Sequence, residues 1–100
     1  MIQDVDRIIH EPARLLLLIY LFSVEKADFT FLKTQTGMTQ GNLSSHLQKL
    51  EIAGYIRTEK KFQGKRPLTL ILITDQGREA FRSYVKGMHH YFSDLLELVD

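Results

Sequence analysis

The sequence predicts a mainly α-helical domain with one small β-hairpin, an α+β chain that forms a single domain over residues 1–100. Three observations support this fold class. Apolar residues recur at helical spacing in segments 13–22, 40–53 and 75–99. Between the last two segments, over residues 55–73, the spacing of apolar residues changes from the helical period of 3.6 to the strand period of 2. Glycines separate the periodic segments. One hundred residues allow one domain with a modest core.

Composition limits the classes of function. The sequence has no cysteine, which excludes disulfides, thiolate zinc sites and thiol catalysis. Its strongest apolar run, Leu15–Leu21, is far too short to cross a bilayer and follows Pro12, unlike a secretory signal. We therefore expect a cytoplasmic protein with no membrane partner and no cofactor.

Two helices are predicted before residue 25. Apolar residues at helical spacing indicate a short first helix within Met1–Ile9. Pro12 suits the first turn of a second helix, and the nearly continuous apolar run Ala13–Phe22 predicts burial on most sides. Residues 25–28 read as a polar connector.

A helix–turn–helix is predicted over residues 29–53. Thr30 is a candidate cap for its short first helix, which Gly37 ends. Thr39 is a plausible N-cap for the second helix, which starts at Gln40, and Gly54 suits the left-handed position after its end.

The second helix has one apolar and one polar side. Leu43, Leu47 and Leu50 form the apolar stripe. The opposite side carries amides, hydroxyls and one cation, and it carries no carboxylate that phosphates would repel. These side chains are suited to hydrogen bonds with base edges and phosphates. DNA recognition is therefore our leading interpretation, against an ordinary solvated surface. Gly41 either lets the helix end approach a phosphate or is simply tolerated in the first turn.

A hairpin with a basic tip follows. Residues 55–62 and 68–73 read as two strands joined by residues 63–67, so the whole hairpin covers about 55–73. The formal charge is +1 overall, but residues 49–66 carry six basic and two acidic side chains, or +4. Concentrated positive charge beside the polar helix suits a nucleic acid, whereas the alternative is a plain solvated hairpin tip.

The last helix, about residues 75–99, is capped by Thr74 and is long. Twenty-five residues extend about 37 Å. Its broad apolar stripe exceeds what so small a domain covers, so the excess contacts a partner chain or stays an exposed patch. The candidate dimerisation residues are Phe81, Tyr84, Val85, Met88, Tyr91, Phe92, Leu95 and Leu96.

Catalytic and metal sites have little support. Ser44, Ser45 and His46 diverge around the helix, and His46 is expected to be a partly buried packing residue. His89 and His90 are adjacent on a helix and do not converge on one ion. Aromatic residues of the last helix could line a small-molecule pocket, but core or dimer packing is the commoner role. We expect no enzyme and no metal.

The order of these elements resembles that of winged helix–turn–helix transcriptional regulators of the MarR/ArsR type, over roughly residues 10–85. The resemblance rests on residues 37–47, residues 50–56, the segment GKRPLT at 64–69 and ITDQGR at 73–78. It implies a recognition helix in the major groove, Lys65 or Arg66 at the minor groove, and a homodimer through the terminal helices. The absence of cysteine departs from the metal-sensing members.

Double-stranded DNA is therefore the expected partner, and a small-molecule effector is not identified. The expected DNA contacts are Thr39, Gln40, Gly41, Asn42, Ser44, Ser45, Gln48, Lys49, Lys60, Lys61, Gln63, Lys65 and Arg66. The alternative function is a winged-helix module for protein–protein contact in a larger complex.

Overall fold

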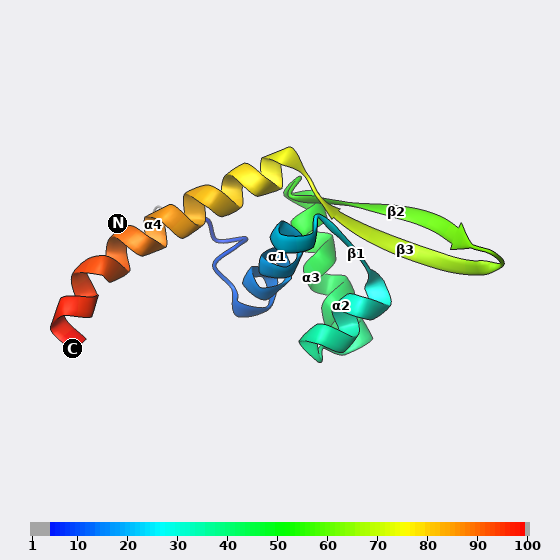
Figure 1. Cartoon of the computed structure of the whole chain (residues 1–100), viewed down its shortest axis with the longest axis horizontal. Helices are drawn as coiled ribbons and strands as arrows, with labels where there is room; N and C mark the ends of the chain where they lie inside the picture. The colour runs from blue at the N-terminus through cyan, green and yellow to red at the C-terminus, as the bar shows by residue number, and fades with distance from the viewer. Residues whose placement is uncertain (1–4, 100) are drawn as a thin grey trace.

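Four helices and a three-stranded antiparallel sheet make up residues 5–99, the part of the chain that the computed structural model describes (Figure 1). The elements are α1 (Pro12–Val24), β1 (Lys26–Asp28), α2 (Phe29–Thr36), α3 (Gln40–Ile52), β2 (Ile56–Gln63), β3 (Arg66–Ile73) and α4 (Asp75–Val99). The strand order is β1-β3-β2. The β2–β3 hairpin and α4 project from the helical body in opposite directions, which gives the chain extents of 56 × 25 × 21 Å (Figure 1).

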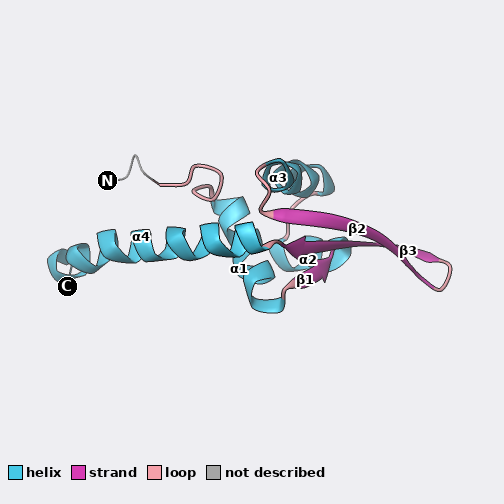
Figure 2. Cartoon of the chain, turned by 90° about the horizontal axis from the view of Figure 1, so that it is seen from above, coloured by secondary structure: helices cyan, strands magenta, loops and turns pink. Residues whose placement is uncertain are grey.

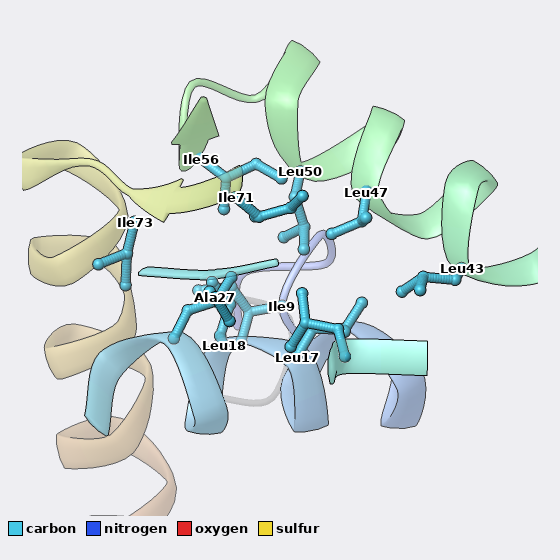
Figure 3. Close-up of a cluster of buried hydrophobic side chains, with 12 residues drawn as sticks. Ile9, Leu17, Leu18, Ala27, Leu43, Leu47, Leu50, Ile56, Ile71 and Ile73 are labelled. Atoms are coloured by element: carbon cyan, nitrogen blue, oxygen red, sulfur yellow. The ribbon is translucent and has the colours of Figure 1, made fainter. Parts of the chain in front are cut away.

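The core lies between α1, α3 and one face of the sheet (Figure 3). Leu17 and Leu18 of α1 are fully buried, as is Leu50 of α3. Ile71 and Ile73 point from β3 into the same cluster, so this face of the hairpin is the one that meets the core. The predicted apolar stripe of α3 is thus confirmed.

Capping residues explain where three helices begin. Pro12 occupies the first turn of α1, where its missing N–H costs nothing, and Glu11 accepts a hydrogen bond from the backbone N–H of Ala13. The Thr39 hydroxyl accepts from the backbone N–H of Asn42 at 3.2 Å, as predicted for the N-cap of α3. The Thr74 hydroxyl accepts from Gly77 N–H at 2.9 Å at the start of α4.

The connection between α2 and α3 also follows the prediction. Gly37 ends α2 in the left-handed conformation with φ of 70°. Gly54 has φ of 84° immediately after the C-cap of α3. Both torsions are cheap for glycine and strained for other residues, so these two positions stop their helices.

Two expectations at the start of the chain were wrong. The described part of the first predicted helix, residues 5–9, forms bends and turns, because the Asp6 carboxylate accepts from the N–H groups of Ile8 and Ile9 and replaces a helical pattern; residues 1–4 lie outside the described residues. Asp28, not Thr30, caps α2 and accepts from Phe31 N–H at 2.8 Å. The helix α1 is buried on most sides, as predicted, since Ile19 is the one exposed residue of Ala13–Phe22, at 45%.

Two further corrections concern the sheet. The expected polar connector contains β1, which pairs with β3 through Ala27 opposite Ile71. Strand pairing also runs to Gln63 opposite Arg66, so the hairpin loop is only Gly64-Lys65 and not residues 63–67. The strand β1 was missed because three residues with charged ends are too few to show a period of 2. The ends of β2 and β3 were missed because their basic residues resemble those of a loop.

The helix α4 touches the body only through its first half. Thr74 N–H donates to the Tyr55 carbonyl at 3.0 Å, which anchors the start of the helix. Phe81 packs edge-on against Phe22, with ring centroids 5.0 Å apart. Beyond these contacts the helix extends away from the body (Figure 1). None of the helices in residues 5–99 combines the length and apolarity needed to cross a membrane.

Candidate nucleic-acid interface

The outward side of α3 is free in the described chain. Its leucines are buried beneath it, while every residue predicted to contact DNA from Thr39 to Lys49 is exposed. The Thr39 cap and the glycine turn hold the first turn of α3 at the surface. The helix therefore presents a row of amide and hydroxyl groups to solvent.

The hairpin tip gathers basic side chains. Gly64 has φ of 65° at the first position of the two-residue turn, which is the arrangement a type II′ turn requires. Lys60, Lys65 and Arg66 are exposed and form no ion pair with any residue in the 5–99 range. Their charges are available to an anionic partner.

A groove joins the helix and the hairpin. Gln40, Ser44 and Gln48 of α3 face Thr58 and Lys60 of β2 across a hollow of about 320 Å³. Figure 2 shows α3 beside the hairpin. The structure thus brings four of the predicted contact residues onto one concave surface. Three polar side chains of α3 line one side of it, and Lys60 of β2 lines the other.

Other predicted residues lie outside this groove. Lys61 is on the opposite face of β2, where its Nζ lies 3.6 Å from Glu59 Oε1. Arg57 shares the same carboxylate, with 3.5 Å between Nε and Oε2. Glu59 partly neutralises Arg57 and Lys61 on the outer face of the hairpin, whereas Lys60, on the side that faces α3, has no ion-pair partner among residues 5–99.

Two residues of this surface were missed from the sequence. Glu51 lines the groove at the C-terminal end of α3, so the surface is not free of carboxylates there. Phe62 is 75% exposed near the hairpin tip. Period-2 alternation from Lys60 would have placed Phe62 on the groove side, but the strand register was needed to see it.

The partly buried His46 was expected to be a packing residue, but its contacts are polar. Its Nδ1 lies 3.1 Å from Glu11 Oε2 and 3.2 Å from a guanidinium nitrogen of Arg14. Arg14 is only 8% exposed and its Nε donates to the Ile8 carbonyl at 2.6 Å. These contacts connect α3 to the start of α1.

The predicted dimerisation residues divide into two groups. Phe81 and Tyr84 are partly covered by the chain's own body, and the Tyr84 hydroxyl lies 2.9 Å from His10 Nδ1. Burial raises the pKa of Tyr84. Phe92 and Leu96, by contrast, are 52% and 58% exposed.

An apolar hollow of about 430 Å³ lies between α1 and the first half of α4. Ile19 of α1 and Val85 of α4 line it with other apolar and aromatic residues and are themselves 45% and 46% exposed. The hollow is continuous with the exposed stripe of α4 through Phe92.

The histidines of α4 give no sign of a metal site. His89 and His90 are exposed, and His90 contacts the ring of its neighbour Tyr91. Residues 5–99 contain no cluster of three or more histidine or carboxylate side chains suited to a metal ion.

Residues 13–92 match the family model of the winged helix DNA-binding domain. The chain belongs to this family. The resemblance to winged helix–turn–helix regulators is therefore confirmed, with β2 and β3 as the wing, and the family is one of DNA-binding regulators rather than enzymes.

Relatives with known sequences and structures are similar over most of the chain. An uncharacterized protein of Methanocaldococcus jannaschii is 38% identical over 79 residues, which are 79% of this chain and 86% of the relative. The solved structure of a transcriptional regulator homologue from Pyrococcus horikoshii is 32% identical, with a TM-score of 0.86 over 90% of this chain and 89% of that one. The uncharacterized HTH-type transcriptional regulator YdgJ of Bacillus subtilis is 29% identical, and the match covers 84% of this chain but only 51% of the relative.

Proposed function

We propose that the chain is a homodimeric transcriptional regulator that binds double-stranded DNA sequence-specifically. The helix α3 enters the major groove, and the wing reaches the adjacent minor groove and its phosphates. The observation that carries this proposal is the shared groove, in which Gln40, Ser44 and Gln48 face Lys60 of the wing. Amide and hydroxyl side chains can both donate hydrogen bonds to base edges and accept hydrogen bonds from them, while the lysine and its basic neighbours neutralise phosphates.

The residues divide by role. Gln40 and Ser44 lie in the N-terminal half of α3, which reaches deepest in helix–turn–helix complexes, and are the candidates for base edges. Lys49, Lys60, Lys65 and Arg66 bear charge without hydrogen-bond acceptors and are assigned to phosphates. Lys61 takes a peripheral role, because it faces away from α3 beside Glu59.

The dimer would form through α4 and the hollow between α1 and α4. Phe92, Leu95 and Leu96 are each about half exposed along one stripe of α4. An exposed apolar surface of this extent is costly in water, and a second copy covers it symmetrically. Two-fold symmetry would then place two recognition helices in successive major grooves, roughly 34 Å apart.

Selection of bound fragments from random duplex DNA tests this function directly. We expect an enriched, pseudo-palindromic site with half-sites roughly 10 base pairs apart. Gln40→Ala should change the preferred bases, whereas Arg66→Ala should weaken all sequences similarly and reduce the salt slope by about one. Failure of the wild-type protein to enrich any sequence, at low salt and with a folded dimer confirmed, would overturn the proposal.

A further inference from the structure

Phe62 is an exposed aromatic residue on a narrow part of the wing. Its side chain is 75% exposed, and the cross-strand partner is Pro67, which is also exposed. The third strand, β1, pairs with β3 only between Leu70 and Leu72, so the sheet has two strands at this level. No described part of the core is near enough to cover the ring.

The strand register places this pair on the side of the wing that faces α3. Side chains two residues apart share one face of a strand, so Phe62 lies on the same face as Thr58 and Lys60. Both of those residues line the groove shared with the recognition helix. Phe62 and Pro67 therefore form an apolar extension of the groove surface toward the tip.

The pair lies near the cationic tip of the hairpin. Lys60 is on the same face of β2 as Phe62, Lys65 is in the turn, and Arg66 pairs with Gln63 and so lies on the opposite face. No residue in the 5–99 range forms an ion pair with any of these three. An exposed aromatic side chain with an unpaired lysine on its own face and a cationic turn beside it suits a partner that is anionic at its edges and apolar inside, as a DNA duplex is with its phosphates and stacked bases.

The reach of the wing agrees with this partner. Phe62 is four residues beyond Thr58, which corresponds to about 13 Å along the strand. A major groove is about 12 Å wide. With α3 in the major groove, the groove-side lysine would lie at the intervening phosphates and the aromatic ring at the neighbouring minor groove.

We propose that Phe62, supported by Pro67, is an apolar wedge that enters the minor groove beside each half-site and partly unstacks one base step. The wedge rests on the proposed function and adds a base-step preference to it. Apolar side chains inserted in this way kink the duplex, and pyrimidine–purine steps yield most easily. The wing thus selects flexible steps, such as TA, that α3 does not read.

A fluorescent base reports on this directly. Duplexes carrying the selected site would contain 2-aminopurine at each flanking position in turn, because its fluorescence rises when it loses a stacked neighbour. The wild-type dimer should raise the fluorescence at one position beside each half-site. Phe62→Ala should abolish that rise and weaken binding roughly tenfold, as expected from loss of one aromatic–base stack.

Matched variants separate the wedge from other causes. Phe62→Leu keeps apolar bulk and should retain most of the rise. Lys61→Ala alters the neighbouring residue on the opposite face of β2 and should leave the rise intact. Circular dichroism and the melting temperature would establish that each variant folds.

The outcomes distinguish this inference from the function on which it rests. No binding by the wild-type protein would overturn the proposed function. Binding of the selected DNA by the wild-type protein without any rise in 2-aminopurine fluorescence at the flanking positions would overturn the wedge alone. This outcome does not depend on the folding of the variants. A rise that persists in Phe62→Ala would also overturn it.

Discussion

The imidazole Nδ1 of His46 lies 3.1 Å from the carboxylate Oε2 of Glu11, so α3 is tethered to the residue that caps α1. A guanidinium nitrogen of Arg14 lies 3.5 Å from the same carboxylate oxygen. Glu11 Oε2 is buried and accepts no hydrogen bond within residues 5–99, and the Arg14 guanidinium at 3.5 Å offsets its charge. The position of α3 on the body therefore depends on a polar contact as well as on its leucines.

Replacement of His46 by Ala should destabilise the domain by about 1–3 kcal/mol, because the buried Glu11 Oε2 would lose its polar neighbour at 3.1 Å and the imidazole would leave a gap between α3 and α1. Urea unfolding followed by circular dichroism measures this change. His89→Ala is the matched control, since His89 is exposed on α4. Equal stability of the two variants would show that the tether contributes nothing.

Gly77 should tolerate no side chain. A Cβ atom built there would lie 2.1 Å from the carbonyl oxygen of Tyr55, which is backbone and already accepts from Thr74 N–H. Gly77→Ala should therefore cost about 3 kcal/mol or more through overpacking. The thermal unfolding midpoint is the measurement.

Gly87 provides the control on the same helix. A Cβ atom there would meet nothing within 4 Å. Gly87→Ala should thus be neutral or stabilise α4 by up to about 1 kcal/mol through helix propensity. A larger loss at Gly87 than at Gly77 would contradict the assigned contact with Tyr55.

Tyr55 should make stability depend on alkaline pH. Burial, together with the hydrogen bond to Asp6 and the charge of that carboxylate, raises the pKa of the Tyr55 phenol from 10.0 to about 12. The neutral phenol is favoured in the fold, so its contribution is complete below pH 10 and is lost as the pH rises through 12.

The comparison with Tyr55→Phe isolates this contribution. The variant lacks the hydrogen bond to Asp6 and should be less stable by about 1 kcal/mol at neutral pH. Its deficit should shrink between pH 10 and pH 12, because only the wild-type protein loses the Tyr55 contribution there. A deficit that stays constant over this range would refute the linkage.

Charge placed on the α4 stripe should dissociate the proposed dimer. Phe92→Glu would put a carboxylate where a partner's apolar surface is expected, and should raise the dimer dissociation constant about thirtyfold or more. His90→Glu is the control, since two residues turn the helix by about 200° to its other side. Analytical ultracentrifugation distinguishes the species, and an unchanged dimer in Phe92→Glu would place the interface elsewhere.

Local signals in the sequence predicted most of the fold. Thr39 and Gly37 marked the ends of helices through backbone chemistry that acts within a few residues, and Leu43, Leu47 and Leu50 identified the buried side of α3. The three-residue strand β1 carried no period and became visible only through its pairing with β3.

The candidate site was less predictable, because it depends on contacts between distant segments. The exposed side of α3 could be inferred from one helix, but the groove with Lys60 required the placement of β2. The hydrogen bond between Asp6 and Tyr55 spans 49 residues, and no pattern in either segment indicates it. Phe62 likewise gained its interpretation from the register with Pro67.

The most direct test of the account is a pair of groove-specific probes on the selected DNA site. Guanine-N7 methylation reports on the major groove, and hydroxyl-radical cleavage reports on the minor groove. We expect methylation interference inside each half-site, relieved at one position in Gln40→Ala, with minor-groove protection immediately beside it. Minor-groove protection without any methylation interference, or interference and protection that Gln40→Ala and Arg66→Ala leave unchanged, would contradict the placement of α3 and the wing.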